Sequence, residues 1–118
     1  MEKGEQVFEI IRCLYASEIP CAVEYSYIPT SLCPHMTESQ VEENGLYKTL
    51  QSFGIVPERA VEQLTASTVS REDALLLSIR PEDTVIHIER TTYCASSAFE
   101  YTLTTLRCNF FFYTNELK

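Results

Sequence analysis

Two arginines and two glutamates recur in similar surroundings in this chain, and these residue types are suited to binding a polar ligand. Arg12 and Glu24 lie in VFEIIRCLYASEIPCAVEY, and Arg90 and Glu100 lie in VIHIERTTYCASSAFEY. A guanidinium and a carboxylate in one cleft can bind complementary polar groups or move protons. The repetition predicts two related charged pairs.

Each charged pair is predicted to lie on a β-hairpin. Residues 6–16 and 21–28 are rich in Val, Ile, Phe and Tyr and flank the turn-forming segment SEIP. Residues 83–94 and 98–113 have the same character and flank ASS. Such alternating runs around short polar segments are typical of antiparallel hairpins.

Turn position predicts which residues face each other across the strands. A turn centred near residue 18 places Arg12 directly opposite Glu24, and a turn centred near residue 95 places Arg90 opposite Glu100. The two hairpins would then differ by two residues, and an even difference keeps every side chain on its original face. We therefore expect a cross-strand Arg–Glu pair in both hairpins, at the margin of an apolar surface.

Such pairs have two interpretations. Opposite charges across neighbouring strands stabilise a sheet by a few tenths to about 1 kcal/mol without binding anything. Alternatively, the two hairpins meet about a pseudo-twofold axis, and their charged pairs line a polar cleft that holds a small molecule. Duplication of the pair beside apolar residues favours the cleft.

Helices are predicted between the hairpins. Thr37-Glu38-Ser39-Gln40 and Ser70-Arg71-Glu72-Asp73 are capping-box patterns at helix starts, and glycines bound a short helix over residues 45–54. Residues 58–68 alternate in character and are predicted to form a strand. The expected fold class is α+β, an antiparallel β-sheet with flanking helices.

Composition narrows the class of protein. The 118 residues suffice for one domain, and seventeen acidic against nine basic side chains give a net charge of −8, which disfavours direct nucleic-acid binding. No apolar run is long enough for a membrane span. Five cysteines without a CxxC motif favour reduced thiols in a cytoplasm, and no metal-ligand set or cofactor motif is present.

The order of motifs resembles the effector-sensing UTRA domain of bacterial transcription regulators in the HutC branch of the GntR family. The matching stretches cover essentially the whole chain. They are VFEIIRCLYASEIPCAVEYSYIP, SLCPHMTESQVEENGLYKTLQSFGI, QLTASTVSREDALLLSIRPEDTVIHIERTTY and FEYTLTTLRCNFFFY. The resemblance implies an α+β fold similar to chorismate lyase, without catalytic activity.

The same resemblance implies how the protein works. It implies a homodimer that binds a small effector and reaches DNA only through an N-terminal winged helix-turn-helix domain. Nothing in residues 1–118 matches that DNA-binding domain, and the first hairpin begins almost at Met1 without its own preceding strand and helix. We therefore expect a single UTRA-like domain truncated at its N-terminus.

Site residues follow from the resemblance position by position. Sugar-phosphate sensors of this family hold phosphate with Arg-x-Arg and Ser-x-Tyr; here these read Arg12-Cys13-Leu14 and Gly45-Leu46-Tyr47, so half of the anion-binding set is absent. A sugar, sugar phosphate, carboxylate or amino-acid-like effector remains possible. The predicted ligand-binding residues are Arg12, Glu24, Tyr47, Arg90 and Glu100.

Two other functions stay open at this point. One is an enzyme on the chorismate lyase-like fold, although no nucleophile–base set is present. The other is a modulator without DNA-binding heads that forms mixed dimers with full-length regulators. His35 is expected on the surface, and His87 is expected to serve the structure from the face opposite Ile86 and Ile88.

Overall fold

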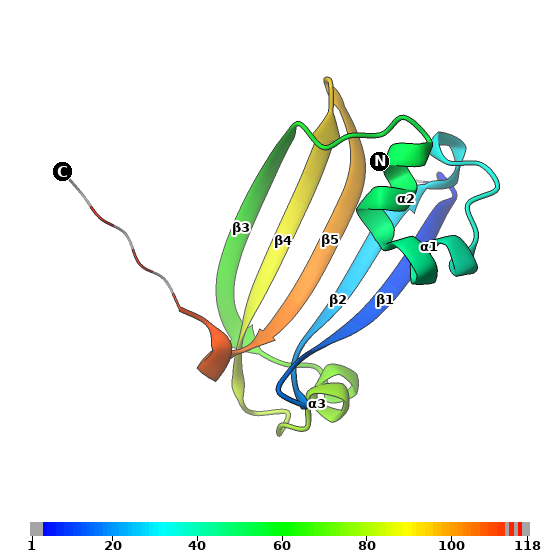
Figure 1. The fold of residues 1–118 in the computed structure, drawn as a ribbon. Coiled ribbons are helices and arrows are strands. Elements are labelled where there is room, and N and C mark those ends of the chain that lie inside the picture. The colour runs from blue at the N-terminus through cyan, green and yellow to red at the C-terminus, as the bar shows by residue number, and fades with distance from the viewer. Residues whose placement is uncertain (1–3, 113, 115, 117–118) are drawn as a thin grey trace.

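One antiparallel sheet organises the chain in the computed structural model, which describes residues 4–112, 114 and 116 (Figure 1). Its five strands lie in the order β1-β2-β5-β4-β3, and three short helices accompany them, so the predicted α+β class is confirmed. The elements are β1 (Val7–Ala16), β2 (Ile19–Pro29), α1 (Glu38–Asn44), α2 (Leu46–Ser52), β3 (Arg59–Thr68), α3 (Arg71–Leu77), β4 (Thr84–Cys94) and β5 (Ser97–Arg107), with 3-10 turns at Thr30–Leu32 and Cys108–Phe110.

The two hairpins, β1–β2 and β4–β5, have the same construction. Each has a two-residue turn, Ser17-Glu18 in the first and Ala95-Ser96 in the second. Each also carries a β-bulge just beyond the turn, at Cys21 in β2 and at Phe99 in β5, where one residue has no partner on the opposite strand. The repeat in the sequence is therefore a repeat in structure, joined along β2 and β5.

The final strand is shorter than its sequence pattern predicts. The prediction ran from residue 98 to 113, but β5 ends at Arg107 and a 3-10 turn follows. β5 ends close to the end of its neighbour, because Arg107 lies opposite Val85, one residue from the start of β4 at Thr84. Tyr113, the last residue of the predicted strand, lies outside the described residues.

Local signals place the helices as predicted. Thr37 and Gln40 form a complete capping box at the start of α1. Gly45, at φ 82° and ψ 161°, separates α1 from α2 in a backbone conformation that is essentially restricted to glycine. Ser70 caps α3 by accepting a hydrogen bond from the Asp73 amide.

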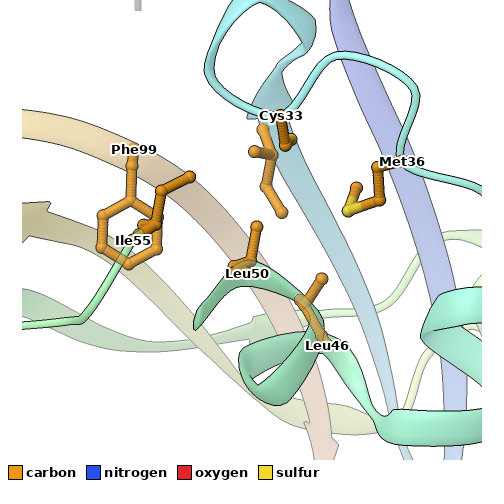
Figure 2. Packing of buried hydrophobic residues seen from close by; sticks show 7 residues of the cluster. Cys33, Met36, Leu46, Leu50, Ile55 and Phe99 are labelled. Atoms are coloured by element: carbon orange, nitrogen blue, oxygen red, sulfur yellow. The ribbon is translucent and has the colours of Figure 1, made fainter. Parts of the chain in front are cut away.

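Different helices pack on the two faces of the sheet. Helices α1 and α2 cover one face near β1 and β2, and Figure 2 shows the core that they form there with Phe99 of β5. Helix α3 packs on the other face beside β2, around Val69, Ala74 and Val85. We call the face that α1 and α2 cover the α2 face, and it carries the predicted site. Within the described residues, no helix has the length and apolar character needed to cross a bilayer.

Candidate functional site

Strand register places the predicted charged residues on one face of the sheet. Directly opposed residues of an antiparallel sheet share a face, and alternate residues along a strand return to it. Glu62, Arg90, Thr102 and Ser26 therefore form one row across four strands, from β3 to β2. Neighbouring rows on the same face hold further polar side chains, and Tyr47 of helix α2 reaches them from the layer above the sheet. We call the set the polar strip: Arg12, Glu24, Ser26, Tyr47, Glu62, Arg90, Thr92, Glu100, Thr102 and Thr104.

The predicted Arg12–Glu24 pair is confirmed. The two residues lie directly opposite each other on β1 and β2, and the Arg12 guanidinium forms an ion pair with the Glu24 carboxylate. The second carboxylate oxygen of Glu24 accepts a 3.3 Å hydrogen bond from the hydroxyl of Thr104 on β5. This pair therefore links three strands.

The predicted cross-strand Arg90–Glu100 pair is wrong. Arg90 lies opposite Thr102, and Glu100 lies opposite Thr92. The turn at Ala95-Ser96 lies slightly later than predicted and moves the partner of Arg90 from Glu100 to Tyr101, and the bulge at Phe99 moves it one residue further to Thr102, a difference of two in all. Because the difference is even, Arg90 and Glu100 still share a face.

Arg90 instead pairs with the strand on its other side. Its Nε and Nη2 atoms lie 2.6 and 2.5 Å from Oε2 of Glu62 on β3. Burial by itself lowers the pKa of Arg90, but the bond to Glu62 outweighs this and the net shift is upward. The guanidinium is thus held in its charged form.

Glu100 takes its hydrogen bond from a helix rather than from a strand. The Tyr47 hydroxyl donates to Glu100 Oε1 at 2.6 Å, and the Glu100 side chain is almost fully buried, with 1% of the residue exposed. Burial and the bond to Glu100 raise the pKa of Tyr47 to about 12, while Arg90 acts in the opposite direction. Tyr47, Glu100 and Arg90 are therefore close together, as the predicted site requires.

Several buried polar atoms of the strip have no hydrogen-bond partner among the described residues. These are Ser26 Oγ, Thr92 Oγ1, Thr102 Oγ1 and Arg12 Nε. Ser26, Thr92 and Thr102 are each less than 5% exposed. Buried polar groups are nearly always paired, and an unpaired one costs about 1–3 kcal/mol. Such a concentration on one face is typical of a place that a polar ligand or ordered water completes.

A groove beside the sheet reaches Arg12. It has a volume of about 470 Å³ and lies between β1 and α1, where Arg12, Glu38, Glu42 and Val41 are among its lining residues. A cleft of this size fits a small molecule. The structure thus joins a polar strip to an open groove at Arg12.

Comparison with known proteins identifies the family. The model of the UTRA domain matches residues 1–111. This chain belongs to the UTRA domain family. It is also 33% identical over 97 residues to the HTH-type transcriptional repressor NagR of Bacillus subtilis (strain 168), an alignment covering 80% of this chain and 40% of NagR.

Solved structures share the fold of this UTRA domain. The ligand-binding domain of a GntR-family transcriptional regulator from Bordetella bronchiseptica matches with a TM-score of 0.88 at 24% identity, over 100% of this chain and 77% of that one. The effector binding domain of the Bacillus subtilis trehalose repressor matches with a TM-score of 0.81 at 21% identity, over 100% of this chain and 83% of that one. The relatives are thus transcription regulators and their effector-binding domains.

The opposite face of the UTRA domain has a hollow of its own, of about 430 Å³. Several of its polar groups are paired within the protein. Tyr25 donates to Asp73 at 2.6 Å, and His87 lies between the Thr68 carbonyl and the Thr105 hydroxyl. The prediction that His87 serves the structure from that face agrees with these bonds. His35 is exposed in a loop, as predicted.

Sequence reasoning missed Glu62 and the unpaired hydroxyls of Ser26, Thr92 and Thr102. Their signal was present, because Ser26 and Thr102 each follow a predicted glutamate by two residues and so share its face. A polar residue repeated on a face that a helix is expected to cover marks a site rather than a core. Glu62 had no such signal, since its role depends on which strand lies beside β4.

Proposed function

We propose that this UTRA domain binds a small-molecule effector in the polar strip and thereby controls the DNA binding of a transcription regulator of the GntR family, HutC branch. The supporting observation is the cluster of unpartnered, buried Ser26, Thr92 and Thr102 hydroxyls around the Glu100 carboxylate. The predicted ligand-binding residues Arg12, Glu24, Tyr47, Arg90 and Glu100 all belong to or surround this cluster.

Control by the effector is proposed to be a population shift. Tyr47 and Glu100 join helix α2 to a central strand through one hydrogen bond. A ligand that binds Glu100 more strongly in one position of α2 than in another favours that position. In a dimer, such a shift changes the spacing of attached DNA-binding domains and therefore their fit to an operator.

The homodimer and the non-catalytic role belong to the same proposal. The outer edges of β1 and β3 are the two ends of the sheet, and strand edges of this kind readily pair with another chain. The relatives regulate transcription, so the proposed compartment is the cytoplasm, where bacterial DNA lies. The chain spans 40% of NagR, so DNA binding is assigned to the regulator as a whole.

A thermal-shift screen tests effector binding. Sugars, sugar phosphates, amino acids and carboxylates are added to the chain, and a true effector at about 100 times its Kd adds roughly 2.7 kcal/mol to the free energy of unfolding. For a domain of this size, that raises Tm by roughly 10 °C. Arg12→Ala and Glu24→Ala are expected to abolish the rise while circular dichroism still shows a folded sheet.

Matched controls come from an exposed ion pair. Arg80 and Glu82 lie 3.6 Å apart and are both largely exposed, away from the polar strip. Arg80→Ala and Glu82→Ala remove the same charges and are expected to keep the full response. A response that persists unchanged in Arg12→Ala and Glu24→Ala would place the effector elsewhere and refute the proposed site.

A further inference from the structure

Both guanidiniums of the polar strip are already neutralised by the protein. Arg12 is paired with Glu24, and Arg90 makes two contacts with one oxygen of Glu62. A phosphate entering the site has to displace the glutamate carboxylate that the fold already holds beside each arginine. Each arginine therefore already holds a carboxylate that an incoming anion would have to displace, and of their nitrogens only Arg12 Nε is buried without a partner among the described residues.

The remaining charge around the site is negative. Glu100 is buried, and among the described residues no arginine or lysine lies within ion-pair distance of it. Three further carboxylates, those of Glu9, Glu38 and Glu42, line the groove that leads to Arg12. A cleft with one sign of charge concentrates ligands of the other sign and repels like charge.

The hydroxyl groups indicate the other half of the ligand. Ser26, Thr92 and Thr102 can each donate and accept a hydrogen bond, and all three lie unpaired beside Glu100 or one row from it. A ligand hydroxyl matches these groups, while an ammonium matches the carboxylate that they surround. A fully ionised phosphate ester group offers acceptors only and leaves Glu100 with its single bond from Tyr47.

We propose that the effector is a hydroxylated molecule with a primary amine and without a phosphate. This inference rests on the proposed function of the polar strip. The amine is inferred from the balance of charge in the strip. The three carboxylates of Glu24, Glu62 and Glu100 outnumber the two guanidiniums of Arg12 and Arg90, so the strip favours a cationic group.

Two matched compound series test the amine and the phosphate separately. The first is glucose, glucosamine, glucose 6-phosphate and glucosamine 6-phosphate, and the second is glycerol, 2-amino-1,3-propanediol and glycerol 3-phosphate. Binding is measured by calorimetry at constant ionic strength and neutral pH. In at least one series, the amine is expected to bind about tenfold or more tightly than the neutral parent, because a charge-assisted bond to a buried carboxylate replaces a neutral one. The phosphate is expected to weaken binding.

A further test uses inorganic phosphate and does not require the effector to be known. Phosphate is expected to raise the Tm of the native chain no more than chloride does at the same ionic strength. In the double variant Glu24→Gln/Glu62→Gln, both guanidiniums lose their carboxylate partners, and phosphate is then expected to stabilise the chain. Glu82→Gln is the matched control, since that glutamate lies at an exposed ion pair.

The outcomes separate this inference from the proposed function. Native stabilisation by phosphate or a phosphorylated probe that Arg12→Ala abolishes would overturn the inference and leave effector binding at the strip intact. Failure of every amine to bind more tightly than its neutral parent would also overturn it. A response to any compound that survives both Arg12→Ala and Glu24→Ala would instead count against the proposed function.

Discussion

Replacement of Tyr47 by phenylalanine tests the bond that joins helix α2 to the centre of the sheet. The substitution removes one hydroxyl and leaves the aromatic ring in place. Its partner Glu100 is 1% exposed and accepts this hydroxyl at 2.6 Å. Water therefore reaches the carboxylate only if the surrounding structure moves.

The size of the effect follows from this burial. A hydrogen bond to a charged group contributes about 1.5–3 kcal/mol when its loss leaves the charge buried and unsatisfied. An unfolding entropy of about 2.1 cal/mol/K per residue converts this loss into a Tm decrease of roughly 6–12 °C for a chain of 118 residues. Tyr47→Phe is therefore expected to be among the more destabilising single-hydroxyl deletions in this protein.

Urea unfolding followed by circular dichroism measures the loss, and Tyr101→Phe supplies the control. Tyr101 also donates to a carboxylate, that of Glu89, but Glu89 is exposed on the opposite face and water can replace the lost bond. The control is expected to change the free energy of unfolding by no more than about 0.5 kcal/mol. Equal losses in the two variants, or no loss in Tyr47→Phe, would refute the argument that Glu100 depends on Tyr47.

Three further predictions concern pH and the helix ends. Burial and bonds to carboxylates raise the pKa values of Tyr47 and Tyr101 from 10.0 to about 12. As pH rises, the unfolded chain therefore loses these two protons before the folded chain does. The stability that the two tyrosine hydroxyls contribute is complete below pH 10 and should disappear as pH rises from 10 to 12. Urea unfolding midpoints across this range, compared between the native chain and Tyr47→Phe, measure the loss. Gly45→Ala should lower the free energy of unfolding by about 1–3 kcal/mol, because the backbone conformation of Gly45 is strained for any residue with a β-carbon. A change near zero in urea unfolding would contradict this prediction. Thr37→Ala should cost about 1 kcal/mol through loss of the α1 cap, seen as a lower urea midpoint, whereas Thr37→Ser should retain most of it.

The polar strip combines groups from distant parts of the chain. Arg90 and Glu62 are 28 residues apart, and Tyr47 and Glu100 are 53 residues apart. Each bond fixes one element against another, so the site forms only when the whole domain folds. We therefore expect effector binding and global stability to be tightly coupled in this protein.

The sequence by itself determined the local features of the site. Alternating side chains around a turn near residue 18 predicted that Arg12 lies opposite Glu24 within one hairpin, and a capping box starts α1 at Thr37. These features depend on residues within about a dozen positions of each other. The assignment of Arg90 and Glu100 to one face also survived, because an even error in register does not change the face.

Only the tertiary structure decided which partner each group takes. Arg90 has a strand on either side, and it pairs with Glu62 of β3 rather than with the hairpin strand that the repeat predicted. Glu100 binds Tyr47, because packing of the apolar core holds α2 over the bulged end of β5. The physical reason is that bulges and neighbouring elements are set by packing of the whole domain, and a local pattern fixes the face of a side chain but not the group that it meets.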